Sequence, residues 1–332
     1  MDWNTLKGIK DSIREPFISI GRLLSKYKNK IEIPYSPSHL ADLNKKYEEN
    51  QEKIDSDLQY LNSISDNLII AKYFGVNETL FEKRDVIEFF HEIRKDKEDE
   101  KPISQMFDDI DSNLGFEFNE IFKGINLKSI LPNAEELEKT EAGKALLKQY
   151  KSFFETGNFS ALLTDVSKMS ESFQNNPQDF NDLRKGLKED LKLDSNISNS
   201  EFPIQKLDSI LPKTPIGKSF SELVIDDVKR YHKEPIFFDY YISGYNQLGL
   251  FGFRSDKLSE KNRFNNMIYD AFHSFYGAHS DIFITNDKVM YHRSKVLFEA
   301  FEIEAKLFKT FEVDDVKKLV DEIERIINTN GG

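Results

Sequence analysis

The sequence predicts an α/β fold in which a short parallel sheet is flanked by helices and interrupted by a large all-helical insertion. Short apolar runs typical of strands occur at residues 31–35, 67–74 and 282–284, toward the two ends of the chain. The middle of the chain is polar, and its apolar residues recur three and four positions apart, which is the period of an amphipathic helix. Strand character at both ends of one chain, separated by helices, is typical of a parallel sheet with an insertion.

The chain begins with a predicted helix over residues 4–27, whose apolar residues have helical spacing. Pro16 should kink this helix, because proline lacks the N–H that the helix interior needs. Residues 30–35 form a strand candidate. Pro34 restricts this strand, because proline is tolerated in a sheet only at a strand end or an edge.

A second helix is predicted to begin directly after the strand candidate. Ser36 is a favourable N-cap residue, and Pro37 occupies the first helical position, where a missing N–H costs nothing. Another helix follows near residues 54–64, and residues 67–74 are predicted to form a strand.

The chain divides by composition into three parts. Residues 1–75 and 235–332 carry the α/β pattern, and residues 76–234 form the predicted helical insertion, which contains no metal-binding or nucleophile constellation. In the last part, a helix near residues 265–278 precedes the strand 282–284. Later elements are a helix over residues 294–301, a strand over 305–311 and a final helix whose apolar stripe should pack onto the sheet.

Composition excludes several classes of site. The chain of 332 residues has no cysteine, which excludes disulfides, thiolate-ligated zinc and a cysteine nucleophile. The net charge of −12 argues against broad nucleic-acid binding, although an acidic metal site is compatible with it. No apolar run is long enough to cross a membrane, and we expect a cytoplasmic protein.

Four aspartates occupy positions that favour a shared site. Asp2 stands at the start of a helix, and Asp42 lies one to two turns into the helix that follows the strand candidate. Asp270 opens a helix, and Asp287 follows the strand 282–284. In an open parallel sheet these positions meet in the crevice where ligands bind. Carboxylates gathered there favour a divalent metal ion and phosphate chemistry.

The ordered set of motifs resembles the PIN-like nuclease family, in a long bacterial variant. The matching segments are Asp2-Trp3-Asn4, Ser36 through Asp42, Asp270 through Ala278, and Ile282 through Asp287. The resemblance covers about the first 75 and the last 95 residues. It implies that Asp2, Asp42, Asp270 and Asp287 hold Mg²⁺ or Mn²⁺ and catalyse phosphodiester hydrolysis. The implied activity is that of an endonuclease, with RNA ahead of DNA as the substrate.

The resemblance also implies supporting roles for other residues. Asn4 and Thr285 would orient a carboxylate or the attacking water, and Arg293 and Lys295 would hold substrate phosphate. His273 lies three residues after Asp270, on the same helix face. Proteins of this kind act as toxins, RNA-processing enzymes or antiviral-defence effectors, and the insertion would bind a regulatory protein partner.

Other interpretations stay open. The chain is alternatively a catalytically inactive PIN-like scaffold, or a phosphatase of another α/β fold, although it has no phosphate-binding glycine loop. Asp281 is a rival ligand, but it more simply leads into the strand. Lys295 is alternatively an ion-pair residue, and the aromatic residues between Phe237 and Tyr245 favour packing over base stacking.

Overall fold

A computed structural model provides the structure of the chain. It describes residues 1–12, 14–73, 78–99, 139–140, 144, 147, 176–193, 195–214, 216–231, 234–255, 258–259 and 264–330. Contacts divide the chain into two compact units. The first comprises Met1–Lys97, Val224–Asn246 and Ile268–Gly332, and the second comprises Glu98–Leu223 and Gln247–Met267. The first unit therefore joins the two ends of the chain.

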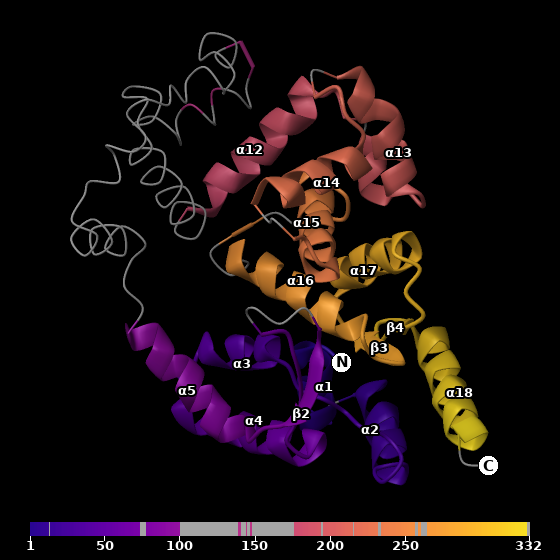
Figure 1. Ribbon diagram of the computed structural model, residues 1–332. Coiled ribbons are helices and arrows are strands. Elements are labelled where there is room, and N and C mark those ends of the chain that lie inside the picture. The colour runs from indigo at the N-terminus through magenta and orange to yellow at the C-terminus, as the bar shows by residue number, and fades with distance from the viewer. Residues whose placement is uncertain are drawn as a thin grey trace. The chain divides into compact units, whose positions relative to one another are not determined.

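The first unit is mostly helical, with short strands (Figure 1). Its elements are α1 Trp3–Asp11, α2 Phe17–Lys26, α3 Pro37–Asn44, α4 Gln51–Ser65, β1 Leu68–Ala71, β2 Leu80–Lys83, α5 Val86–Asp99, α14 Phe220–Tyr231, α15 Phe237–Leu250, α16 Phe264–Gly277, β3 Ile282–Thr285, α17 Lys288–Ala300, β4 Lys306–Lys309 and α18 Val313–Asn330, of which α5, α14, α15 and α16 extend past the unit boundaries. The predicted single helix over residues 4–27 is two helices: α1 ends at Asp11, where Ser12 is a left-handed C-cap residue, and α2 begins directly after Pro16.

The predicted start of α3 is confirmed. Ser36 is the N-cap residue and Pro37 is the first helical residue. The Ser36 N–H donates to His39 Nδ1 at 3.0 Å, which closes a capping box between the two residues. The start of α3 is therefore held by local hydrogen bonds.

The strands form two small sheets. β1 pairs with β2 in an antiparallel sheet, with Leu68 opposite Lys83, and the sequence did not predict β2. β3 pairs with β4 in parallel, with Ile282 opposite Lys306, and α17 is the crossover helix between them. Within the described part of the chain, the predicted single parallel sheet was wrong, because the two sheets do not join.

The predicted strand over residues 30–35 was also wrong. Only Tyr35 pairs with β1: its N–H donates to the Leu68 carbonyl at 2.9 Å, and the Ile70 N–H donates to the Tyr35 carbonyl at 2.8 Å. Pro34 has no N–H to extend this ladder. A cavity of about 900 Å³ is lined by residues 30–34 together with side chains of β1 and β3. This hollow separates the strand edges that a single sheet would need to join.

Among the described residues of the first unit, two apolar cores are defined. One contains Tyr35, Leu40 and Phe90 with residues of α1, α4 and β1. The other packs Ile20 of α2, Ile284 of β3 and Leu319 of α18, so the predicted apolar stripe of the last helix is confirmed as a packing face. Figure 1 shows the N-terminus beside β3, where the Asp2 N–H donates to the Ile284 carbonyl at 3.2 Å.

The described elements of the second unit are all helices. The unit contains α12 Pro177–Asp190, the 3₁₀ turns η2 Ser195–Asn199 and η3 Leu211–Lys213, α13 Pro203–Ile210 and the first residues of α14 Phe220–Tyr231. Phe180, Leu258 and Met267 form a small buried cluster. The prediction that residues 76–234 are all helical was wrong at β2, which is a strand. The other described elements in this range are helices, and residues 101–138 and 148–175 lie outside the described ranges.

None of the described helices combines the length and apolar character needed to cross a lipid bilayer.

Candidate functional site

The turn after β3 is held by its own side chains. The Thr285 hydroxyl donates to Asp2 Oδ2 at 2.6 Å and accepts a hydrogen bond from the Asp287 N–H at 2.9 Å. Asp287 is the N-cap residue of α17, and its Oδ1 accepts from the Met290 N–H at 2.7 Å. The sequence prediction that Asp287 follows the strand is confirmed, and the cap orients its carboxylate.

Asp2 joins the N-terminal helix to this turn. Its carboxylate is buried, and Oδ1 accepts from the Thr5 N–H at 2.8 Å, so Asp2 is the N-cap residue of α1. Its other oxygen accepts from Thr285. Each carboxylate oxygen has two lone pairs, so these bonds leave acceptor capacity on Asp2. Asp2 therefore links the start of α1 to the turn after β3.

Asp42 is linked to the helix that carries Asp270. His273 Nε2 of α16 lies 2.9 Å from Asp42 Oδ2, and the Lys45 ammonium lies beside Asp42 Oδ1. Burial raises the pKa of Asp42, but the hydrogen bond from His273 and the charge of Lys45 outweigh it and hold that pKa well below its usual range. Asp42 is therefore a carboxylate that accepts the His273 N–H.

The His273 ring packs against a second histidine, His39. Their centroids lie 4.8 Å apart in an edge-to-face arrangement. His39 Nε2 faces the Met1 carbonyl at 2.8 Å and must donate to it, so Nδ1 is the acceptor for Ser36. Burial, then the neighbouring His273, lowers the pKa of His39 well below its usual value. His39 is a neutral support for the Asp42–His273 pair.

Asp270 lies in the second turn of α16, which begins at Phe264, so its predicted place at the helix start was wrong. Burial and the negative charges of Asp287 and Asp42 raise the pKa of Asp270 well above its usual value. Lys45 and Arg293 act in the opposite direction. Carboxylates from α3, α16 and the turn before α17 thus share one electrostatic environment. We call Asp42, Asp270 and Asp287 the acid cluster.

The remaining predicted residues divide into two groups. Arg293 is buried, and its guanidinium carbon lies 5.3 Å from the centroid of the Tyr245 ring. Asn4 is exposed on α1, and Lys295 is exposed on α17, where it pairs with Glu299 at 3.8 Å. No described contact joins Asn4 or Lys295 to the acid cluster, so the ion-pair interpretation of Lys295 fits its position.

Sequence reasoning missed two residues near the acid cluster. Lys45 follows Asp42 by three positions, a spacing that brings side chains together on a helix, and its ammonium also lies 4.7 Å from the centroid of the Tyr269 ring. Tyr245 was interpreted only as packing. Its spacing of four from Tyr241 places both residues on one face of α15.

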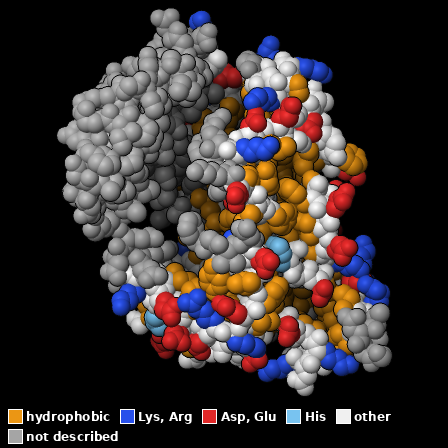
Figure 2. All heavy atoms as spheres, viewed as in Figure 1, with side chains coloured by type: hydrophobic (Ala, Val, Ile, Leu, Met, Phe, Trp, Pro, Cys, Tyr) orange, Lys and Arg blue, Asp and Glu red, His pale blue; other side chains and the backbone are white. Residues whose placement is uncertain are grey.

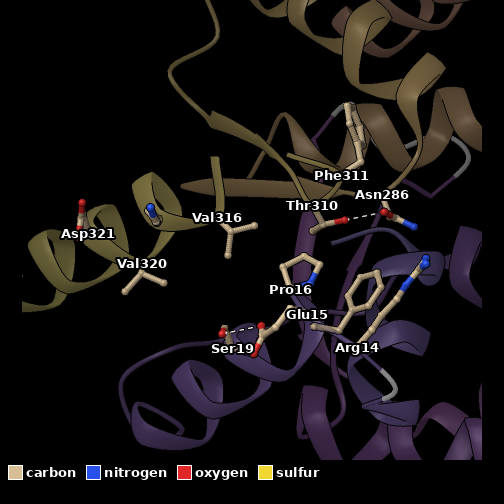
Figure 3. Close-up of a pocket in the computed structure, with 12 residues that line it drawn as sticks. Arg14, Glu15, Pro16, Ser19, Asn286, Thr310, Phe311, Val316, Val320 and Asp321 are labelled. Carbon is tan, nitrogen blue, oxygen red and sulfur yellow. Dashed lines mark hydrogen bonds between the residues drawn. The ribbon is translucent and has the colours of Figure 1, made fainter. Parts of the chain in front are cut away.

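A cavity of about 640 Å³ lies beside the same turn (Figure 3). The Thr310 hydroxyl donates to Asn286 Oδ1 at 2.7 Å, and both residues line the cavity. Pro16, Phe311 and Val316 contribute apolar parts of its wall, and Arg14 and Glu15 are charged residues at the same cavity. The three side chains of the turn therefore diverge, with Thr285 toward α1, Asn286 toward this cavity and Asp287 in the acid cluster.

The donor atoms of the acid cluster are hard carboxylate oxygens, which suit Mg²⁺ or Mn²⁺. Among the described residues, no three or more His, Asp or Glu side chains are close enough together to hold a metal ion. A cation bound in this geometry would therefore have fewer than three of these side chains as direct ligands, and water would complete its coordination.

Comparison of the chain with protein-family models, with curated proteins and with solved structures finds no match.

Proposed function

We propose that this chain is a metal-dependent endonuclease that hydrolyses phosphodiester bonds, with RNA as the favoured substrate and DNA second. The observation that carries the proposal is the acid cluster, in which the hydrogen bonds of Asp42 with His273 and of Asp287 with the Met290 N–H fix two carboxylates. Burial and the charges of these two acids raise the pKa of Asp270, the third member. Repelling carboxylates from three separate elements are costly unless a cation or proton neutralises them. The PIN-like order of these acids along the chain supports the same activity.

Asp42, Asp270 and Asp287 would hold one or two Mg²⁺ or Mn²⁺ ions, with Asp2 as a fourth acid. A bound divalent ion neutralises charge on the phosphate and lowers the pKa of the attacking water. The chain's own residues position the acids: His273 fixes Asp42 through its 2.9 Å contact. The hydrogen bond that Asp287 Oδ1 accepts from the Met290 N–H fixes the Asp287 carboxylate.

Two cations lie in the field of the acid cluster, Lys45 and Arg293. They suit the phosphate backbone of a substrate. Figure 2 shows acidic and basic side chains intermixed over the described residues of the visible face. Substrate attraction would therefore depend on local cations rather than on a uniformly basic surface.

We also propose that residues 76–234 regulate the enzyme by binding a protein partner, as in a toxin or an antiviral-defence effector in the cytoplasm. The alternative, a catalytically inactive scaffold, is favoured by one observation: no group of three metal-ligating side chains is assembled among the described residues.

The deciding experiment measures cleavage of labelled single-stranded RNA and DNA with Mg²⁺ or Mn²⁺. Asp270→Asn and Asp287→Asn should abolish cleavage, and asparagine still caps α17. The matched control is Asp281→Asn, because Asp281 is exposed and lies at the opposite end of β3. Cleavage by both cluster variants at the wild-type rate would reject the site. A wild-type protein that cleaves neither nucleic acid, with or without metal ion, and that binds no metal ion would favour the scaffold.

A further inference from the structure

A chain of buried hydroxyls joins three helices of the first unit. The Tyr241 hydroxyl of α15 lies 2.5 Å from Ser274 Oγ of α16, and Ser274 Oγ lies 2.6 Å from Ser294 Oγ of α17. All three residues are buried. Each hydroxyl in this layer has a partner, which is the normal state of buried polar groups.

The next helical turn of α15 and α16 brings Tyr245 level with Asp270. Helices α15 and α16 run antiparallel, because Phe237 contacts His279 whereas Tyr241, one turn later, contacts Ser274. One further turn along α15 is Tyr245, and one turn back along α16 from Ser274 is Asp270. The helix register therefore places Tyr245 level with Asp270, at the acid cluster.

The Tyr245 hydroxyl has no hydrogen-bond partner among the described residues, although the side chain is fully buried. The Arg293 guanidinium lies over its ring rather than at its hydroxyl, with 5.3 Å between guanidinium carbon and ring centroid. The charges of Asp270 and Asp287 act on the hydroxyl and, after burial, raise its pKa. A buried hydroxyl without a partner is rare and costs free energy. A bound ligand that supplies the partner would remove this cost.

We propose that Tyr245 is a positioning residue whose hydroxyl binds a hydration water of a divalent cation held by Asp270 and Asp287. This inference rests on the proposed function. Mg²⁺ and Mn²⁺ favour oxygen ligands, and Mg²⁺ in proteins usually retains several waters. A tyrosine hydroxyl both donates and accepts, so it suits a water beside carboxylates, which only accept. Tyr245 would thus orient the hydrated cation without contacting it directly.

The structure offers a matched pair of variants for the test. Tyr245→Phe removes a hydroxyl that has no protein partner, and Tyr241→Phe removes one that is bonded, from the same helix and with the same full burial. In metal-free protein we expect Tyr241→Phe to lower the urea midpoint of unfolding. Tyr245→Phe should leave that midpoint unchanged or raise it, because no protein hydrogen bond is lost.

The second readout is the affinity for Mn²⁺ alone, measured by electron paramagnetic resonance titration. We expect Tyr245→Phe to weaken Mn²⁺ binding about tenfold or more, as loss of an outer-sphere partner does. Tyr241→Phe should bind Mn²⁺ as the wild type does.

The outcomes separate this inference from the proposed function. Mn²⁺ binding by the wild type with unchanged affinity in Tyr245→Phe would overturn the role of Tyr245 and leave the nuclease proposal standing. Equal loss of Mn²⁺ affinity in both tyrosine variants would also overturn it, since the effect would then be structural. Failure of the wild type to bind Mn²⁺ would overturn both proposals together.

Discussion

Gly277 allows α16 to approach β3, and we expect Gly277→Ala to destabilise the protein. An added Cβ would lie 2.4, 2.5 and 2.7 Å from three ring carbons of Phe283. Carbon atoms in contact prefer about 3.5–4.0 Å, and Phe283 is buried in β3 with little room to retreat. Overpacking of this kind costs about 1–3 kcal/mol. Alanine at a helix end recovers less than about 1 kcal/mol of helix propensity. The net loss should be about 1–2 kcal/mol, the difference between these two contributions.

The same change should disturb the acid cluster. Gly277 ends the helix that carries Asp270, and Phe283 lies in the strand that leads to Asp287. Relief of the clash would move α16 away from β3 and change the separation of the two acids. We therefore expect weaker Mn²⁺ binding as well as lower stability in Gly277→Ala.

Gly244→Ala is the matched control, because Gly244 is also helical and its added Cβ would meet only Leu297 Cδ2 at 3.4 Å. That contact is ordinary, so the control should gain about 0.5–1 kcal/mol from helix propensity. Urea unfolding followed by far-UV circular dichroism measures both variants. A Gly277→Ala variant that unfolds at the same urea concentration as Gly244→Ala would refute the reasoning.

Three further predictions concern charge and capping. Because the pKa of Asp270 is raised, its carboxyl group keeps its proton in the folded state above pH ~4. Ionisation of this carboxyl group therefore lowers the free energy of unfolding as the pH rises. Asp270→Asn should therefore raise the melting temperature at pH 8 and lose this advantage near pH 4; an equal advantage at both pH values would contradict the prediction. The lowered pKa of His39 means that its neutral form stabilises the fold above pH ~6.5 and that this contribution is lost as the pH falls. His39→Gln should flatten the dependence of the urea midpoint between pH 5 and 7, whereas an unchanged profile would assign the dependence to other groups. Asp2→Ala should lower stability by about 2–4 kcal/mol, because it removes the acceptor of the Thr5 N–H and leaves the Thr285 hydroxyl with a weak acceptor, Met290 Sδ at 3.6 Å. Asp2→Asn keeps one acceptor oxygen and should lose about 1 kcal/mol in the same urea assay; equal losses would refute the capping argument.

Local rules predicted much of the secondary structure. Ser36 and Pro37 mark the start of α3 because capping depends on residues within one helical turn. α2 begins directly after Pro16 for an equally local reason. The position of Asp287 after a strand followed from the order of apolar and polar residues alone. These features depend on neighbours in the chain, which the sequence displays directly.

The candidate site was only partly predictable. The order of the aspartates indicated an acidic site, but the helix register of Asp270 and the partners of Asp42 were not visible. His273 reaches Asp42 across 231 positions of sequence. The unbonded hydroxyl of Tyr245 gave no sequence signal, because an interior tyrosine looks the same whether or not its hydroxyl finds a partner.

By itself, the sequence determined the α/β character of the chain, the main helix starts and the ordered set of acids. Only the tertiary structure decided which strands pair. The expected strand that contains Pro34 is limited to one bridge with β1 at Tyr35, and β2, which the sequence did not predict, also pairs with β1. Strand pairing depends on hydrogen-bond partners distant in the chain, and helix starts depend on residues nearby. For the same reason, the electrostatic environment that Asp42, Asp270 and Asp287 share is a property of the packed fold.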